Sequence, residues 1–98
     1  MAKIRWTIES ERWLKDIYEF IAMDNQDSAG KVVKNIYEKV KTLKQFPQSG
    51  YMYKDVNEGE IRILLYGHYR IAYLLRSDNV IDILGIFHGA LDIEKYLF

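Results

Sequence analysis

The few polar side chains inside the apolar last third of the chain are its best candidates for chemistry: Arg62, Arg70, Arg76, Asp82 and His88. Charges set among buried strand residues cost free energy unless they are paired or used. Guanidinium groups beside a histidine, which titrates near neutral pH, would suit anion binding or phosphodiester cleavage. Arg62, Arg70 and His88 are the sharpest set of this kind.

Structural pairing is the competing interpretation of the same residues. Each arginine could form an ion pair with Asp82, with Glu60 or with an acid of a partner chain. The sequence favours such pairing, so it assigns no catalytic residue outright. Arg62 lies near the start of one predicted strand and His88 near the end of another. If these strands flank a middle strand, the two side chains could converge on one face of the sheet.

No known metal or phosphate motif occurs in the chain, which has no HExxH, no Walker loop and no GxGxxG. His68 and His88 have no evident third ligand, so we expect neither a metal nor a cofactor. Tyr51 and Tyr53 could stack bases or anchor a peptide, although such residues more often pin a loop to its domain. We interpret the lysines of the second predicted helix as a solvated face: Lys31, Lys34, Lys39, Lys41 and Lys44.

Three apolar runs between residues 61 and 97 must position the candidates. Val, Ile, Leu and Tyr fill these runs, as half-buried strands prefer. Turn signals separate the runs at residues 67–68 and 77–79. Spacing this tight leaves no room for a crossover helix, so the runs predict an antiparallel meander. Residues 90–98 could add a helical turn.

The first part of the chain predicts a strand and a helix. Residues 3–8 alternate in character and predict a short strand. Ser10 is a plausible N-cap for a helix over residues 11–23. The apolar stripe of this helix consists of Leu14, Ile17, Tyr18 and Ile21.

A second, clearer helix follows the polar turn at residues 24–28, where Asp27 or Ser28 could be the N-cap. Its apolar stripe consists of Ala29, Val32, Val33, Ile36, Val40 and Leu43. Pro47 closes the run, because proline cannot continue a helix. We expect residues 48–59, rich in Gly, Ser, Asn and Asp, to form a loop. A loop this long in a small domain is often functional.

The order of elements is therefore β-α-α-β-β-β, in one domain spanning residues 1–98. We predict an α+β fold in which a helical hairpin packs on one face of a small, mainly antiparallel sheet. The predicted core joins both helices to the sheet: Leu14, Ile17, Ile21, Val33, Ile36, Val40, Leu43, Ile63, Ile71, Tyr73 and Leu84. The strand runs are apolar at nearly every position, so the second sheet face also needs a cover. Nothing else in the chain is expected to supply it, and a partner chain is the simple explanation.

Composition narrows the class of protein further. Lysine plus arginine and aspartate plus glutamate each number 14, so the formal net charge is zero. A protein that lives on nucleic acid usually carries a strong basic excess, which this chain lacks. The absence of cysteine excludes disulfides and thiol chemistry and fits a reducing, cytoplasmic location. The N-terminus has no long apolar stretch, so we expect neither a signal peptide nor a membrane anchor.

Five short sequence stretches follow one another along almost the whole chain, and their order is informative about the family. They are WLKDIYEFIAMDN (13–25), LKQFPQSG (43–50), IR (61–62), GHYRIAYLL (67–75) and IDILGIFHGALDIEKYL (81–97). Together with the order of elements, they resemble the RelE/ParE superfamily of bacterial type II toxins, and the ParE branch more than the RelE branch. The resemblance implies the same α+β fold.

The resemblance implies one of two toxic activities. RelE-like members cut messenger RNA in the ribosomal A site, whereas ParE-like members lack that catalytic set and poison DNA gyrase. Arg62 matches a strand arginine of the nucleases, and His88 sits where some of them carry a catalytic histidine. With Arg70, these residues would form the catalytic set of a nuclease. Gly89 stands where those nucleases place a tyrosine, the net charge is neutral, and the ending HGALDIEKYL looks ParE-like. Gyrase inhibition is therefore preferred, with ribosome-dependent RNA cleavage as the alternative.

The resemblance also implies a partner. Toxins of this superfamily are neutralised by an antitoxin, here similar to ParD or RelB, that is usually encoded beside them in plasmid-stabilising modules. The C-terminal segment of the antitoxin wraps the toxin as an extended strand or a helix, which gives a hetero-oligomer and fits the uncovered apolar surface. An inactive relative that still binds an antitoxin is the third alternative.

Overall fold

The computed structural model describes residues 1–89 and 91–97. Its elements are β1 (Lys3–Trp6), α1 (Ile8–Ala22), α2 (Gln26–Lys41), the 3₁₀ turn η1 (Thr42–Lys44), β2 (Tyr51–Val56), β3 (Gly59–Tyr66), β4 (Tyr69–Arg76), β5 (Val80–His88) and α3 (Glu94–Leu97). Over these described residues, a single sheet contains five strands in the order β1-β5-β4-β3-β2. β1 runs parallel to β5, and the other neighbouring strands are antiparallel.

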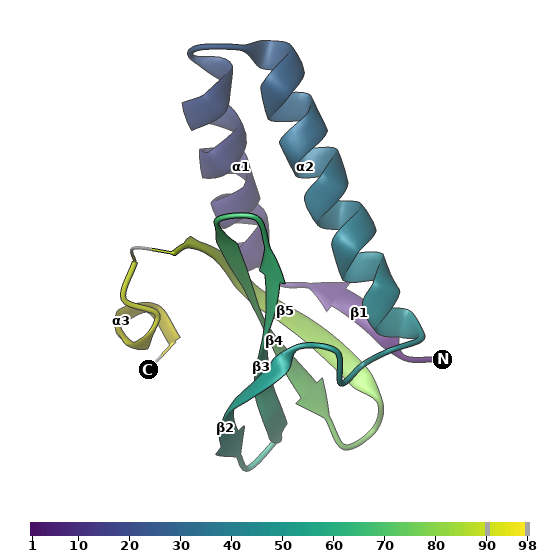
Figure 1. Ribbon diagram of the computed structural model, residues 1–98. Helices are drawn as coiled ribbons and strands as arrows, with labels where there is room; N and C mark the ends of the chain where they lie inside the picture. Colours follow the sequence, from purple (N-terminus) through teal and green to yellow (C-terminus); the bar gives the residue numbers. More distant parts are fainter. Residues whose placement is uncertain (90, 98) are drawn as a thin grey trace.

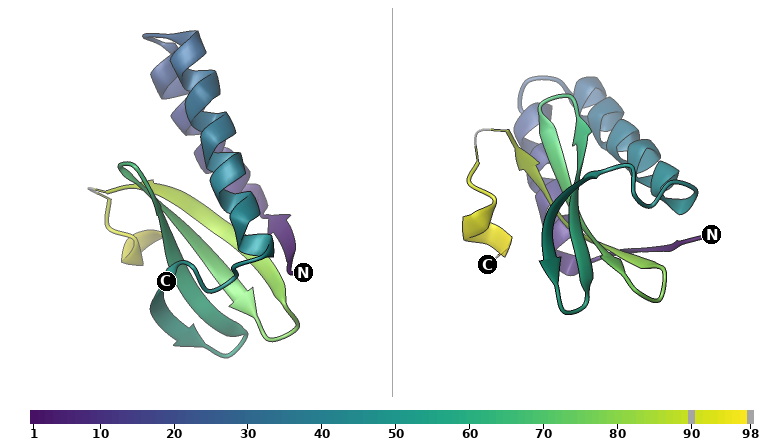
Figure 2. Two further views of the ribbon diagram at one scale, coloured as in Figure 1. Left: turned by 45° about the vertical axis from the view of Figure 1, so that its right-hand side comes forward. Right: turned by 60° about the horizontal axis from the view of Figure 1, so that its bottom comes forward.

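The helices α1 and α2 form a hairpin that stands on one face of the sheet (Figure 1). The right-hand view of Figure 2 shows β3 and β4 between α2 on one side and α3 on the other. We call the sheet face that packs against α1 and α2 the helix face, and the opposite one the tail face. The α+β architecture, with a helical hairpin on a mainly antiparallel sheet, is confirmed. Within the described ranges, no helix has the length and apolar character needed to cross a membrane.

Both predicted turns of the meander are confirmed. The backbone reverses at residues 67–68, where Gly67 takes a φ of 54°, and at residues 77–79, where Asn79 takes a φ of 66°. Glycine and asparagine reach this left-handed region more easily than other residues. Such short turns fix the strand register, which decides the face on which each side chain lies. The helical turn expected in the C-terminal tail is also confirmed, as α3, although the two predicted tail residues 90 and 98 lie outside the described ranges.

Both helices begin earlier than predicted. Thr7, rather than Ser10, caps α1, and its hydroxyl accepts a hydrogen bond from the Ser10 N–H at 3.1 Å. Ser10 is buried in the first turn, where its hydroxyl donates to the Thr7 carbonyl at 2.8 Å. Asn25, rather than Asp27 or Ser28, caps α2 by accepting from the Ser28 N–H at 3.0 Å. A cap residue has extended backbone, as Thr7 and Asn25 do, and the first strand is correspondingly shorter than predicted.

The loop predicted over residues 48–59 is wrong at its centre, which forms the edge strand β2. This strand pairs with β3 in antiparallel register, with a shift between Met52 and Lys54. Its sequence, YMYKDV, shows no clean alternation, because most of its side chains are exposed. Its strand character comes from hydrogen bonding to β3 rather than from burying one face, and a sequence pattern does not reveal such pairing.

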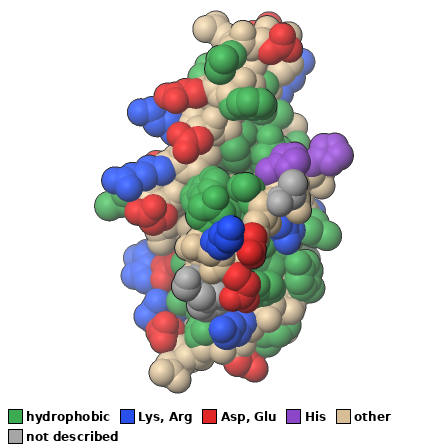
Figure 3. All heavy atoms as spheres, turned by 90° about the vertical axis from the view of Figure 1, so that its left-hand side faces the viewer, with side chains coloured by type: hydrophobic (Ala, Val, Ile, Leu, Met, Phe, Trp, Pro, Cys, Tyr) green, Lys and Arg blue, Asp and Glu red, His purple; other side chains and the backbone are tan. Residues whose placement is uncertain are grey.

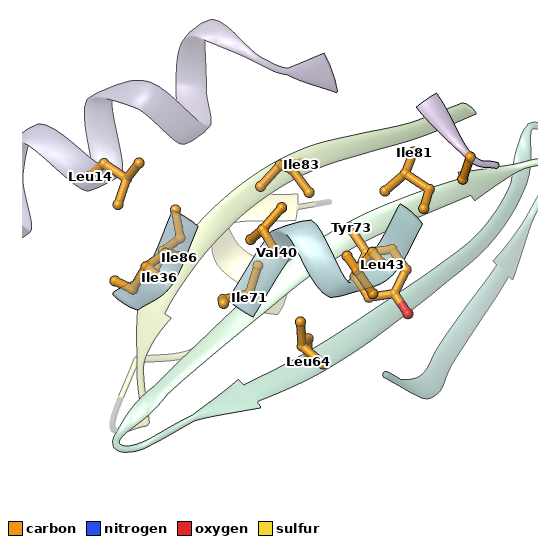
Figure 4. Packing of buried hydrophobic residues seen from close by; sticks show 11 residues of the cluster. Leu14, Ile36, Val40, Leu43, Leu64, Ile71, Tyr73, Ile81, Ile83 and Ile86 are labelled. Atoms are coloured by element: carbon orange, nitrogen blue, oxygen red, sulfur yellow. The ribbon is translucent and has the colours of Figure 1, made fainter. Parts of the chain in front are cut away.

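The main core lies between the helix face and the hairpin, where Figure 4 shows aliphatic side chains from α1, α2 and three strands pointing toward one another. The predicted core residues that are fully buried here are Leu14, Ile36, Val40, Leu43, Ile71 and Tyr73. Ile17 and Val33 pack against this core while partly buried, and Ile21 is half-buried. The hairpin and the sheet are therefore joined largely as expected.

A second apolar cluster lies on the tail face: Ile63, Ala72, Phe87 and Ile93. Ile63 lies opposite Ala72 in the register, so the expectation that it packs under the helices is wrong. Leu84 was expected in the helical core too, but it packs against this second cluster. Residues 91–97 fold back over the cluster, with Ile93 only 3% exposed. The expectation that the chain itself supplies no cover for this face is therefore also wrong.

Candidate functional site

Arg62 lies on β3 and holds the segment that leads into β2. Its Nη1 donates to the carbonyl oxygens of Gly50 at 2.6 Å and Gln48 at 3.1 Å. Its Nε donates to Glu60 Oε1 at 2.9 Å, which is the acidic pairing that the sequence suggested. The Arg62 side chain is only 14% exposed. Its guanidinium is therefore engaged in contacts that support the fold.

Tyr73 fastens the same segment from the helix face. Its hydroxyl donates to the Pro47 carbonyl at 2.7 Å and accepts from the Gly50 N–H at 3.0 Å. Burial raises the pKa of Tyr73 above its ordinary value, against the opposing effects of the Gly50 N–H and the Arg62 charge. A Cβ at Gly50 would lie 2.7 Å from the Tyr73 ring, so glycine is needed for this close approach. Arg62 and Tyr73 thus form one clasp around residues 47–50.

Arg70 lies on β4 and points to the tail face, opposite Phe87 in the register. Its Nη2 donates to the carbonyl oxygens of Leu91 at 2.6 Å and Gly89 at 3.2 Å. Its Nε is buried and has no hydrogen-bond partner. Arg70 therefore holds the backbone where the C-terminal segment leaves β5.

His88 ends β5 with an exposed side chain. Its ring lies 6.1 Å from that of Tyr69 at an interplanar angle of 86°, and 6.5 Å from that of His68 in the preceding turn. Among the residues of the described ranges, no group of three potential metal ligands occurs. His68 and His88 thus lie beside each other at one end of the sheet, without a third potential metal ligand among the described residues.

The three residues of the nuclease hypothesis are not brought together. The strands β3 and β5 do flank β4, but Arg62 lies level with Tyr73, and His88 lies level with Tyr69. This offset amounts to about 13 Å along the strands and roughly 10 Å across the sheet. A general base lies within about 3 Å, measured between heavy atoms, of the group whose proton it removes. Since Arg70 also lies on the opposite face, the three side chains do not converge on one point of the sheet.

Asp82 and Arg76 join Arg5 in an ion-pair cluster that links β1, β4 and β5. Arg5 donates to both carboxylate oxygens of Asp82, at 2.7 and 3.1 Å, and Arg76 donates to Asp82 Oδ2 at 3.0 Å. The hydrogen bond from Arg5 lowers the pKa of Asp82 most; partial burial acts in the opposite direction, and Arg76 lowers it further. Asp82 is only 8% exposed. These polar residues are thus paired within the fold.

The lysines and tyrosines singled out in the sequence lie on separate surfaces. All the named lysines but the half-buried Lys39 are exposed: Lys31, Lys34, Lys41 and Lys44. Tyr51 is 48% exposed on β2. The Tyr53 hydroxyl donates to Glu94 Oε1 at 2.7 Å, and this hydrogen bond is the main reason that the pKa of Tyr53 is raised. Tyr53 therefore pins the C-terminal segment.

An apolar groove of about 570 Å³ lies between α1 and the end of the sheet formed by β4 and β5. Its lining residues are Trp13, Asp16, Ile17, Phe20, Tyr69, Ile86, His88 and Leu91. Phe20 is 78% exposed. Figure 3 shows hydrophobic side chains gathered on this side of the molecule, with the histidines at their edge. Exposed apolar surfaces of this kind typically mark sites that bind another protein segment.

The sequence pointed to His88 but not to the other residues that line this groove. Phe20 does carry a usable signal, because it lies outside the apolar stripe of its helix and so has no core to fill. Trp13 lies outside that stripe too and carries the same signal, whereas Tyr69 carries none, because it resembles an ordinary core residue. Their place on the groove depends on how α1 packs against β5.

The chain matches a family model and a bacterial relative along most of its length. A family model described as "ParE toxin of type II toxin-antitoxin system, parDE" matches residues 4–93. A protein of Sinorhizobium fredii named "Putative toxin Y4kP" is 33% identical over 87 residues, which make up 89% of this chain and 88% of that protein.

Two solved structures share the fold. A chain of the chromosomal ParDE TA system from P. aeruginosa is 25% identical, with a TM-score of 0.71 and coverage of 90% of this chain and 96% of its own. A chain of the toxin–antitoxin complex RelBE2 from Mycobacterium tuberculosis is 18% identical, with a TM-score of 0.67 and coverage of 89% and 96%. At 18% identity the second likeness concerns the fold alone.

Proposed function

Because the chain belongs to the ParE toxin family of type II toxin–antitoxin systems, we propose that it poisons DNA gyrase and is neutralised by a cognate antitoxin similar to ParD or RelB. In this role, Arg62, Arg70 and His88 hold the fold or contact a partner rather than catalyse a reaction. Gyrase works in the cytoplasm, and we place the chain there as part of a plasmid-stabilising module.

The dispersal of the residues that a nuclease would need is the observation that carries this choice of target. Arg62 donates to the Gly50 carbonyl, and Arg70 donates to the Leu91 carbonyl, so both guanidinium groups hold backbone. His88 lies about 13 Å along the strands from Arg62, on the face opposite Arg70. A toxin that binds gyrase needs no such catalytic set, and a net charge of zero suits a protein target better than ribosomal RNA.

The groove beside α1 is where we place the antitoxin. It is lined mainly by apolar side chains, and Phe20 at its rim is 78% exposed. Burying such a ring stabilises a complex by about 1.5–3 kcal/mol relative to leaving it in water. An amphipathic helix or an extended segment that lays its apolar side chains into the groove would achieve this burial.

Co-expression with the product of the neighbouring reading frame tests the partner. We expect the two proteins to purify together, and separate purification at micromolar concentration would exclude this partner. In the same assay, Phe20→Asp should weaken the complex at least tenfold, because a charge replaces the apolar ring. Phe46→Asp is the matched control, since Phe46 is 63% exposed but lies outside the groove. Equal effects of the two changes would exclude the groove as the docking site.

Induction of the chain in bacteria, without its antitoxin, tests the target. If gyrase is poisoned, plasmid supercoiling should change before protein synthesis falls. Loss of translation first, with cleaved messenger RNA, would favour the nuclease alternative. Normal growth with intact antitoxin binding would identify an inactive relative.

A further inference from the structure

Residues 91–97, which we call the tail, are held on the tail face by side chains of the sheet and of α1. Ile93 is buried to 3% exposure among the apolar side chains of that face. Glu94 accepts a hydrogen bond from the Tyr53 hydroxyl at 2.7 Å. The tail thus contacts the sheet through one buried aliphatic side chain and one carboxylate, as a separate bound peptide would.

An aromatic stack completes this contact. The ring of Tyr96 lies 5.1 Å from that of Trp13, edge to face, and 5.7 Å from that of Phe87. Tyr96 nevertheless remains 51% exposed. A second groove of about 490 Å³ opens beside the stack, between α1 and the tail. The tail therefore does not fill the surface on which it lies.

The tail has little structure of its own to keep it in place. Its helix α3 spans only Glu94–Leu97. Isolated helices shorter than about 12 residues are marginal in water, so the surface beneath imposes the shape of the tail. Among the described residues, no strand of the sheet pairs with the tail, so its release breaks no strand pairing.

Arg70 indicates that another ligand could make more hydrogen bonds to this surface than the tail does. Its Nη2 holds the Leu91 carbonyl at 2.6 Å, but its Nε is buried and has no hydrogen-bond partner. A buried donor left unpaired is costly. A ligand that also placed a carboxylate or carbonyl oxygen on the Nε would satisfy a group that the tail leaves unsatisfied.

We propose that the tail face is a binding surface for a short, acidic, amphipathic segment of another protein, and that the tail fills this surface until such a segment displaces it. The tail itself shows the required chemistry: an aliphatic anchor in the place of Ile93, a carboxylate for Tyr53 and an aromatic ring in the place of Tyr96. The displacing segment adds an acceptor for Arg70. The surface is separate from the groove that we assign to the antitoxin and does not depend on the cellular target.

Thiol labelling of the full chain tests this displacement, because the natural sequence has no cysteine. Ile93→Cys, at a site only 3% exposed, reports opening of the tail. Leu97→Cys, at a partly exposed site, is a second reporter that is used only for the change in rate caused by Arg70→Gln or by a peptide. Val40→Cys, in the main core at 1% exposure, is the control that reacts only on global unfolding. We expect Ile93→Cys to react at least tenfold faster than the control. Arg70→Gln should speed it about tenfold more without changing the control, because a charged hydrogen bond is lost.

A synthetic peptide of residues 91–97 then tests the surface itself. At about millimolar concentration, matching the effective concentration of the attached tail, it should trap the open form and raise the labelling rate to a plateau. The same peptide with Ile93→Asp and Tyr96→Ala should have no effect. An Ile93→Cys protein that reacts no faster than Val40→Cys would overturn the displacement, and two reporters that ignore the peptide would overturn the binding surface.

Discussion

Replacing Arg62 by alanine should destabilise the fold rather than remove a catalytic group. The substitution deletes hydrogen bonds to the Gly50 and Gln48 carbonyls and to the Glu60 carboxylate. A hydrogen bond from a charged group contributes about 1.5–3 kcal/mol, but bonds made by one side chain do not add fully. We therefore expect a loss of about 2–4 kcal/mol, since the side chain is 14% exposed and water replaces only part of what is lost.

Thermal and urea denaturation followed by circular dichroism measure this loss. For a domain of this size, 2–4 kcal/mol lowers Tm by roughly 10–25 °C. Arg62→Lys should recover part of the stability, because an ammonium group cannot bridge all three acceptors at once. Arg12→Ala is the control: Arg12 and Glu9 form an exposed pair at 3.5 Å, whose loss should cost about 0.5 kcal/mol or less.

Toxicity of the same variants separates a structural role from a catalytic one. If Arg62 supports the fold, toxicity should follow the folded fraction and return at lower temperature. An Arg62→Ala protein that melts like the parent and has still lost all toxicity would refute the structural role.

Three further substitutions test the clasp, the ion-pair cluster and the main core, one each. Tyr73→Phe should cost about 1–3 kcal/mol in urea denaturation, because it leaves the buried Gly50 N–H without its acceptor; an unchanged midpoint would contradict the clasp. Asp82→Asn should cost about 1–3 kcal/mol near pH 7. Since folding lowers the pKa of Asp82 from 3.8, its contribution is present above about pH 4 and is lost as pH falls through the folded pKa, so parent and variant should converge in acid; a constant difference would exclude this linkage. Leu43→Ala, at a fully buried site, should cost about 2–5 kcal/mol, and a loss below 1 kcal/mol would contradict the core.

Features set by neighbouring residues could be predicted from the sequence, whereas features set by distant pairing could not. The turn at residues 67–68 and the stripe from Ile36 to Leu43 are local, and both are confirmed. The sheet face on which Ile63 lies could have been predicted, because a two-residue turn places Ile63 opposite Ala72. The edge strand β2 could not have been predicted, since only its pairing with β3 makes it a strand.

The candidate site follows the same division. Side-chain types identified Arg62 and His88, but the acceptors of Arg62 are mostly backbone carbonyls, which no sequence pattern displays. Asp82 was expected to pair with an arginine, yet its main partner, Arg5, comes from a strand that pairs only through the fold. The groove arises where α1 meets β4 and β5, so its lining residues could not be grouped in advance.

The most direct measurement of the target uses the purified chain in two reactions run side by side. One contains DNA gyrase, ATP and relaxed plasmid, and the other contains ribosomes with a model message. We expect supercoiling to be inhibited, the antitoxin to relieve the inhibition, and the message to remain intact. Ribosome-dependent cleavage of the message, abolished by His88→Ala in a protein with unchanged circular dichroism, would contradict gyrase poisoning and identify a nuclease.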